Sequence, residues 1–168
     1  HHMPGTSQDL DAARAFYTRI SSVYDALADR DEHLARQTGL TLLDAQAGEH
    51  VLEIGFGTGS SLAGLATAVG ASGRVCGIDI SPGMKAVAEQ RLRSTDAGAS
   101  VDLHVAAVPP IPVGDAAFAA VFTAFTLELF PDDTLPTILG EVRRTLRAGG
   151  RFVVVSMDVG TAEQRRGA

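Results

Sequence analysis

A short apolar segment that ends in a run of glycines constrains the fold of this chain most. Residues 51–54 are apolar at three of four positions, and glycines follow at positions 55, 57 and 59. Apolar residues with helical spacing then occupy residues 62–69, before Gly70. Glycines at such a turn let the backbone approach a ligand closely, and the start of a helix offers free N–H donors. The stretch therefore predicts a strand, a ligand-binding loop and a helix.

The rest of the chain continues this alternation of strand and helix. Nearly continuous apolar strands are typical of a parallel sheet that helices cover on both faces. We therefore predict an α/β fold with a Rossmann-like, doubly wound and mostly parallel sheet, in which a proline-rich loop at residues 108–117 replaces one helical connection. The last helix has an apolar face that includes Leu139 and Leu146, and Gly149 and Gly150 are expected to end it. The predicted strands are residues 51–54, 74–80, 101–106, 118–123 and 151–157, and the predicted helices are residues 10–28, 31–46, 62–69, 82–93 and 133–148.

Composition indicates one globular domain. The chain has 168 residues, of which 45% are hydrophobic and 20% charged. The formal net charge of −6 argues against nucleic acid as a partner, because phosphate binding needs a basic surface. No apolar run is long enough to span a membrane. The single cysteine, Cys76, excludes an internal disulfide and favours a cytoplasmic location. The expected organisation is a tag remnant and disordered start at residues 1–4, helices that cap the site at residues 5–47, the binding core at residues 48–160 and a tail at residues 161–168.

Two carboxylates indicate which ligand the glycine loop binds. Asp79 ends the next strand, 20 residues after Gly59, where a carboxylate can accept hydrogen bonds from both hydroxyls of a ribose. A dinucleotide fingerprint needs a third glycine or alanine where this chain has Ser60. Glu53 stands two residues before Gly55. A carboxylate there is of little use to a pyrophosphate, but it suits a cofactor that carries an ammonium and a sulfonium group.

These stretches resemble those of a known family. Residues 51–59 look like motif I of the class I S-adenosylmethionine-dependent methyltransferases, residues 77–84 look like the motif of their second strand, and residues 143–151 resemble the stretch before their fifth strand. The similarity extends over residues 24–157 and is greatest to the quinone-biosynthesis-like group. It implies S-adenosylmethionine as the cofactor, S-adenosylhomocysteine as the product and a small molecule as the methyl acceptor.

The resemblance also implies roles for individual residues. The glycine loop would hold the methionine part of the cofactor, Asp79 would hold the ribose, and Ile80 and Met84 would flank the adenine. The family often carries an aspartate after the third strand, where this chain has Ala107, so the backbone of Ala107 and Val108 would contact the adenine instead. The cofactor site implied in this way comprises Glu53, Gly55, Phe56, Gly57, Thr58, Gly59, Asp79, Ile80, Met84, Ala107, Val108 and Thr123.

The acceptor side of the site is less constrained. Methyl transfer needs the two reactants held close and in line, and it needs a base only where the acceptor loses a proton. Tyr24 and Glu128 are the predicted catalytic residues, because Tyr24 and Asp25 match a pair near the cofactor in relatives and Glu128 follows the fourth strand. Core packing is the alternative for Tyr24, and a solvated turn is the alternative for Glu128. No metal is predicted from the spacing of histidines and carboxylates, and His104 is expected to be packed within its strand. Further side chains expected near the acceptor are Tyr17, His33, Thr123 and Thr126.

Two alternatives to an active methyltransferase stay open. One is an NAD(P)- or nucleotide-binding Rossmann oxidoreductase, and the other is a methyltransferase-like domain that binds ligand without catalysis. A separate expectation concerns the last predicted strand, because the family places further strands beyond it and this chain has eleven residues after Met157. An apolar edge strand invites pairing with another chain. We therefore expect either a truncated form of a longer protein or a homodimer formed through this edge.

Overall fold

Five parallel strands form the sheet in the computed structural model, which describes residues 29–96 and 100–156. The order of the strands is β3-β2-β1-β4-β5. The predicted helix at residues 10–28, both tyrosines and the two terminal segments lie outside the described residues. The strands are β1 (His50–Ile54), β2 (Arg74–Asp79), β3 (Val101–Val105), β4 (Phe118–Ala124) and β5 (Leu146–Val155), and the helices are α2 (Asp29–Leu43), α3 (Leu62–Val69), α4 (Pro82–Arg93), the 3₁₀ helix η2 (Leu127–Leu129) and α5 (Leu135–Thr145).

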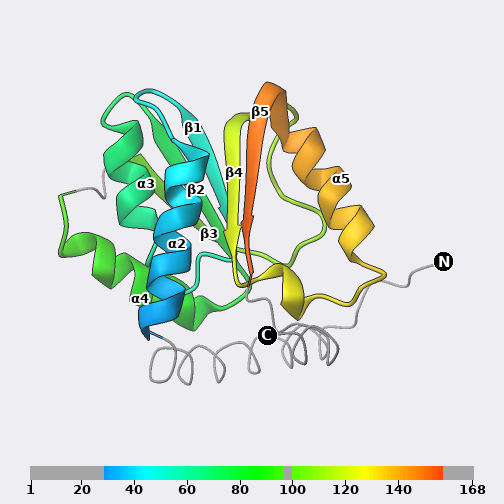
Figure 1. The fold of residues 1–168 in the computed structure, drawn as a ribbon, viewed down its shortest axis with the longest axis horizontal. Helices are drawn as coiled ribbons and strands as arrows, with labels where there is room; N and C mark the ends of the chain where they lie inside the picture. The colour runs from blue at the N-terminus through cyan, green and yellow to red at the C-terminus, as the bar shows by residue number, and fades with distance from the viewer. Residues whose placement is uncertain (1–28, 97–99, 157–168) are drawn as a thin grey trace, which may run out of the picture.

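Helices cover both faces of the sheet (Figure 1). Val51 and Phe122 pack in a core shared with α2, α3 and α4 on one face, whereas Leu52 and Val121 pack in a core shared with α5 on the other. Successive residues of a strand point to opposite faces, so a sheet between two helical layers needs apolar residues at almost every strand position. The predicted doubly wound α/β architecture is confirmed.

The connection from β3 to β4 crosses the sheet without a helix, as predicted. It leads from the β3 edge to the far side of β1, and its residue Ile111 is buried. Arg144 of α5 holds this loop by donating to the carbonyl oxygens of Ile111 and Val113, both at 2.8 Å. The connection that follows β1 therefore runs over one face of the sheet, and the connection that follows β4 runs over the other. Ligands of such sheets bind beyond the carboxyl ends of the strands at the point where neighbouring connections part in this way.

Helix α2 ends three residues before the predicted boundary at residue 46. Its last residue is Leu43, and Asp44 leaves the helix with a φ of 49°. The helix lies unusually close to the sheet at Gly39, where a Cβ atom would collide with the side chains of Val155 and Phe122. This close approach places α2 over β4 and β5.

The predicted boundary between the last helix and the last strand is wrong. Helix α5 ends at Thr145, and β5 begins at Leu146, five residues before the predicted start at 151. Leu146 already pairs with Phe118, and after a register shift Arg151 pairs with Ala120. Gly149, with a φ of 77°, lies in this irregular part of the strand rather than after a helix.

The apolar face of α5 is also narrower than predicted. The helix begins at Leu135 rather than at residue 133, and it buries Ile138, Val142 and Thr145. Leu139 is 47% exposed. Leu146, the other residue assigned to that face, belongs to β5. The helix therefore contacts the sheet through a single row of side chains.

Ion pairs tie together the elements at the amino end of β1. The Glu49 carboxylate accepts hydrogen bonds from the Arg151 guanidinium at 2.7 and 3.1 Å and from the Gln46 N–H at 2.7 Å. Arg147 lies 3.8 Å from the same carboxylate. Arg151 lowers the pKa of Glu49 although partial burial opposes it. Arg151 also donates to the carbonyl oxygen of Leu43 at 2.8 Å, so this network joins the end of α2 to β1 and β5.

Cys76 lies in β2 as a buried free thiol. Burial raises the pKa of this thiol to about 11, so it stays protonated and unreactive near neutral pH. Among the helices of the described residues, none combines the length and apolar character that crossing a membrane requires.

Candidate functional site

The loop after β1 has the backbone geometry that its glycines predict. Gly55, Gly57 and Gly59 have φ values of 72°, 54° and 85°, a region that side chains of L-residues rarely tolerate. A Cβ atom on Gly55 would in addition collide with the side chain of Thr126. The glycines therefore let the loop pass directly beneath the segment that follows β4.

Asp79 holds this loop in place from the end of β2. Its side chain is 3% exposed. One carboxylate oxygen accepts the N–H of Gly57 at 2.9 Å, and the other accepts the N–H of Ser81, also at 2.9 Å. Each oxygen of a carboxylate can accept more than one hydrogen bond, so support of the loop is compatible with the predicted contact to ribose hydroxyls. The supporting role has no signal in the sequence, because it depends on the loop folding back onto β2.

Glu53 is the most unusual group in the site. It is fully buried, and neither carboxylate oxygen has a hydrogen-bond partner among the described residues. Burial raises the pKa of Glu53 to about 8; the charge of Arg36 opposes this shift, and the charge of Asp79 adds to it. A buried polar group without a partner is costly. An orphaned carboxylate at the base of a ligand loop is therefore fitted to receive a cation or a hydrogen-bond donor.

Three side chains that contact one another near the glycine loop have no signal in the sequence. Arg36 of α2 donates from Nη1 to Oγ of the buried Ser61 at 2.8 Å, and its guanidinium carbon lies 5.2 Å from the centroid of the Phe125 ring. Phe125 has a φ of 56°, a strained conformation for a bulky residue that is concentrated at ligand sites. The helix that carries Arg36 is 25 residues from Ser61 in the chain, and no local pattern marks these residues as neighbours.

The end of β4 lies next to the start of the glycine loop. The Thr123 hydroxyl donates to the carbonyl oxygen of Ile54 at 2.8 Å, and the Thr126 hydroxyl donates to the carbonyl oxygen of Ala124 at 2.9 Å. Both bonds fix the backbone where β1 and β4 end. Thr123, predicted as a cofactor residue, thus lies at the site with its hydroxyl proton engaged.

The remaining predicted cofactor residues surround Asp79 and the loop. The N–H of Ala106 donates to the carbonyl oxygen of Asp79 at 3.0 Å, which brings the half-buried Ala107 and Val108 beside the end of β2. Met84 is 6% exposed at the start of α4, where the Ser81 hydroxyl accepts its N–H at 3.2 Å. Phe56 is 2% exposed. Thr58 and Ile80 are partly buried.

Glu128 is the one predicted catalytic residue that the structure describes. It lies in η2, just past the end of β4, and its side chain is exposed. Partial loss of water raises the pKa of Glu128 above its ordinary value. His33 is exposed on α2. Within residues 29–96 and 100–156, no three histidine, cysteine or acidic side chains gather in a group that could hold a metal ion.

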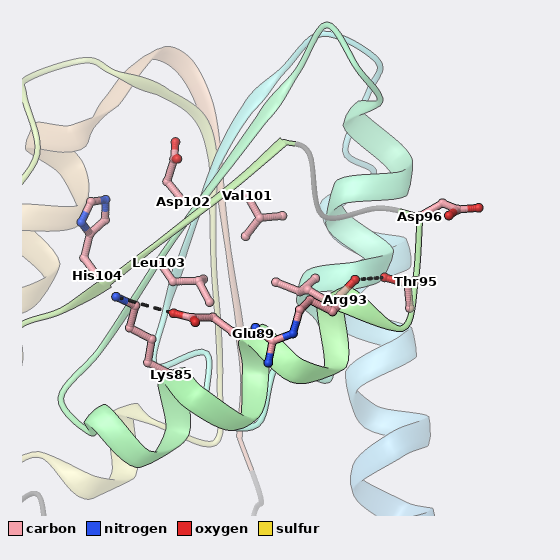
Figure 2. Close-up of a pocket in the computed structure, with 10 residues that line it drawn as sticks. Lys85, Glu89, Arg93, Thr95, Asp96, Val101, Asp102, Leu103 and His104 are labelled. Carbon is pink, nitrogen blue, oxygen red and sulfur yellow. Dashed lines mark hydrogen bonds and ion pairs between the residues drawn. The ribbon is translucent and has the colours of Figure 1, made fainter.

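An open groove at the other edge of the sheet is separate from this site. It lies between α4 and β3, has a volume of about 600 Å³ and contains none of the predicted cofactor residues. Figure 2 shows Lys85 of α4 pointing toward Glu89, 3.6 Å away. His104, expected to be packed, is exposed here. That expectation is wrong because β3 is an edge strand, and His104 and Asp102 lie on the face of β3 that α4 does not cover.

Comparison with known proteins identifies the domain. The profile of a family described as a methyltransferase domain matches residues 51–150. A 2-phytyl-1,4-naphtoquinone methyltransferase of Synechococcus elongatus is 28% identical over 88% of this chain and 64% of its own length. Nocamycin O-methyltransferase of Saccharothrix syringae is 33% identical over 81% of this chain and 48% of its own length.

A solved structure shares the fold. A S-adenosylmethionine-dependent methyltransferase from Aquifex aeolicus superimposes with a TM-score of 0.68, over 86% of this chain and 79% of its own, at 24% identity. The chain spans between 39% and 64% of the length of the first relatives that it matches.

Proposed function

The chain belongs to the methyltransferase domain family, and on that basis we propose that it binds S-adenosylmethionine and transfers the methyl group to a small-molecule acceptor. The buried, unpartnered carboxylate of Glu53 at the base of the glycine loop is the observation that carries this proposal. A pyrophosphate offers hydrogen-bond acceptors alone, so it would not supply a donor to this carboxylate. The ammonium group of S-adenosylmethionine would instead supply the donors that Glu53 lacks.

The other groups fit the same cofactor. Asp79 would accept hydrogen bonds from the ribose hydroxyls while keeping the Gly57 N–H as a donor. Ile80 and Met84 offer apolar contact to an adenine beside Asp79, and the backbone of Ala107 and Val108 supplies polar groups at the same end of the sheet. These roles correspond to the sequence prediction and stay proposals.

When bound, S-adenosylmethionine supplies a methyl group activated by its positive sulfur. The chain then has to exclude water and keep the acceptor in line with that methyl group. We propose that the acceptor lies against the segment after β4, where Thr126 lies against Gly55 of the glycine loop and the Phe125 ring lies against Arg36. Glu128 would accept the proton of a hydroxyl acceptor, since its raised pKa makes it a better base than an ordinary carboxylate. Tyr24 is the second proposed catalytic residue.

Relatives support a small acceptor rather than a macromolecule. The names of two of these relatives refer to a phytyl naphthoquinone and to nocamycin. The net charge of −6 also makes a nucleic acid a poor substrate. We therefore propose an apolar or aromatic small molecule with a hydroxyl or an activated carbon as the acceptor.

Calorimetric titration with S-adenosylmethionine, S-adenosylhomocysteine and NAD tests the function. Binding of the first two and not of NAD supports the proposal, and binding of NAD alone would support an oxidoreductase instead. Binding of the first two without formation of S-adenosylhomocysteine from any of a set of quinols and phenols would favour the non-catalytic alternative. Substitution of Glu128 by Gln is expected to lower kcat more than it changes KM.

We also propose self-association through the β5 edge. In the described part of the chain β5 pairs only with β4, and Val154 is 43% exposed. Unpaired strand edges with apolar side chains favour pairing with another strand. Light scattering should show a dimer that the substitution Val154→Lys weakens, and a monomer at high concentration would contradict this proposal.

A further inference from the structure

The edge strand β3 presents a row of backbone groups on its open side. In the described part of the chain β3 pairs with β2 alone, in a parallel register that extends from Val101 to Val105. The N–H of Ala106 donates to the carbonyl oxygen of Asp79 in β2, and the N–H groups of successive residues in a strand point in alternate directions. The N–H and C=O groups of Val101, Leu103 and Val105 therefore point away from β2.

This edge has space for a further strand. Proline, bulges, charged side chains or a covering segment often protect the edge of a sheet. Within the described residues, β3 has no proline and its register with β2 has no irregularity. An open groove of about 600 Å³ borders the strand on the side of α4 (Figure 2). The polar side chains of β3 are Asp102 and His104, and their arrangement indicates what pairs with this edge.

The side chains of β3 are self-complementary. Val101 and Leu103 pack toward the core that includes α4, whereas Asp102 and His104 lie on the opposite face of the strand. In an antiparallel pair of two such strands centred on Leu103, each Asp102 faces the partner's His104. On the other face, each Val101 faces the partner's Val105, and leucine faces leucine.

The backbone directions favour this register over its neighbours. Antiparallel strands exchange hydrogen bonds between residues whose N–H and C=O groups face each other, and here those are the two valines and Leu103. Asp102 and the partner's His104 then form a non-hydrogen-bonded pair, in which the side chains approach most closely. A shift by two residues in either direction keeps the hydrogen bonds but places Asp102 opposite itself or His104 opposite itself.

We propose that a second copy of this chain pairs with β3 in antiparallel orientation about a two-fold axis at Leu103, and that reciprocal pairs of Asp102 with His104 fix the register. An imidazole has an N–H donor in both of its charge states, and a carboxylate accepts several hydrogen bonds. The bond that Asp102 already accepts from Arg74 at 2.7 Å is therefore compatible with the contact. A two-fold contact of this kind uses the same surface of both copies and is complete with two.

This contact is independent of the proposed methyltransferase function and of the contact proposed at β5. The two strands lie at opposite edges of the sheet. β3 has 5 residues and β5 has 10, so we expect pairing through β3 at higher protein concentration than pairing through β5. The substitution Val154→Lys, at the β5 edge, provides a parent chain in which pairing through β3 is measured alone.

The first experiment leaves β3 unchanged. Sedimentation of the Val154→Lys chain at concentrations up to about 1 mM should show a reversible dimer. Amide hydrogen exchange, followed by NMR, should slow at Val101, Leu103 and Val105 as the concentration rises. A chain that stays monomeric, or a dimer in which these three amides exchange at an unchanged rate, overturns the proposal.

The second experiment mixes two variants of that parent chain. His104→Asp places carboxylates opposite each other and should weaken association by about tenfold or more, and Asp102→Lys should weaken it by replacing the acceptor with a cation. In an equal mixture, Asp102 of one variant meets His104 of the other, and the introduced carboxylate meets the introduced ammonium. The mixture should therefore associate about as tightly as the parent chain, which loss of folding in either variant would not produce.

Arg74→Gln in the parent chain is the matched control. It removes the same ion pair that Asp102→Lys removes, but it keeps both members of the proposed pair. Association should change by less than about twofold. Loss of association in this control, single variants that associate like the parent chain, or a mixture that associates no more than its components would each contradict the pairing of Asp102 with His104. If either variant does not fold, as circular dichroism would show, the first experiment decides.

Discussion

Two glutamates at the two ends of β1 show how differently one side chain behaves in two environments. Glu49, just before the strand, is surrounded by donors: the guanidinium of Arg151, the N–H of Gln46 and, more distantly, Arg147. Glu53, inside the strand near its carboxyl end, is fully buried and has no hydrogen-bond partner among the described residues. The pKa of Glu49 is lowered by Arg151, whereas burial raises that of Glu53 to about 8.

The difference separates a carboxylate that stabilises the fold from one that we propose binds the cofactor. Glu49 joins α2, β1 and β5, so its charge is compensated within the protein. Burial of Glu53 without a hydrogen-bond partner costs free energy, and in our proposal the ammonium group of the cofactor offsets that cost. Substitution of Glu49 should therefore mainly lower stability, whereas substitution of Glu53 should mainly lower affinity for the cofactor.

Asp79 does not fall on either side of this comparison, and its substitution is expected to have the largest effect on stability and affinity. It supports the fold by accepting the N–H groups of Gly57 and Ser81, and it is also the proposed partner of the ribose. Asp79→Ala leaves two donors without this partner, so the free energy of unfolding should fall by about 2–4 kcal/mol, and affinity for S-adenosylhomocysteine should fall by a further 1.5–3 kcal/mol or about 10- to 150-fold. Urea unfolding and calorimetry measure the two losses.

The variant Asp79→Asn serves as the control for Asp79→Ala. Its amide keeps one acceptor oxygen and should lose less of both quantities. If Asp79→Ala kept wild-type stability and affinity, both the supporting role and the proposed ribose contact of Asp79 would be contradicted.

Glu53→Gln should lower affinity with little effect on stability. The amide loses the charge that would attract an ammonium group, so affinity for S-adenosylhomocysteine should fall by about 10- to 150-fold. With a pKa raised to about 8, the wild-type side chain is mostly protonated at pH 7. The amide resembles that protonated form, and the free energy of unfolding at pH 7 should stay within about 1 kcal/mol of the wild-type value.

Proton release provides a second readout for Glu53. If the bound cofactor pairs with the ionised carboxylate, binding at pH 7 should release close to one proton. Calorimetry in buffers with different ionisation enthalpies detects it. The release should be absent in Glu53→Gln, and its persistence there would assign the proton to another group.

Glu49→Gln should show the reverse pattern with a smaller effect. The amide weakens the hydrogen bonds to Arg151, and the free energy of unfolding should fall by about 1–2 kcal/mol, since the side chain of Arg151 is 36% exposed and water screens the pair. The site lies at the other end of β1, so affinity should change by less than about twofold. A larger loss of affinity would show that the two ends of the strand are coupled.

The pH dependence of stability should differ in direction between the two glutamates. Because the pKa of Glu53 is raised, its protonated form favours the folded state below the ordinary value of 4.5, and this contribution is lost as the pH rises through about 8. Because the pKa of Glu49 is lowered, its contribution is present above 4.5 and is lost as the pH falls below that value. Unfolding of wild type and both Gln variants between about pH 2 and about pH 9 covers both windows and separates them.

Local signals in the sequence predicted the elements around the site. The glycines at 55, 57 and 59 adopt the positive φ values that their residue type allows, and helices α3 and α4 match their predicted ranges. Asp79 ends its strand as predicted. Such features depend on residues within one turn or one strand, so neighbouring residue types are enough to specify them.

Boundaries decided by distant pairing were predicted less well. The start of β5 moved from Arg151 to Leu146 because Leu146 pairs with Phe118 of β4, a contact that no pattern within residues 143–151 reveals. His104 proved exposed because β3 lies at an edge of the sheet. The residues of a strand do not by themselves indicate its position in the sheet.

The sequence by itself determined the class of fold and the glycine loop, since each follows from periodicity or from the conformational freedom of particular residue types, and it singled out Glu53 and Asp79 as the acids of the candidate site. Only the tertiary structure decided what those acids do. It paired Glu49 with Arg151, 102 residues away, and left Glu53 without a described partner. It also placed Arg36 beside Ser61 and Phe125. The charge of a side chain is a local property, but its compensation depends on which distant groups the packing of helices against the sheet brings within reach.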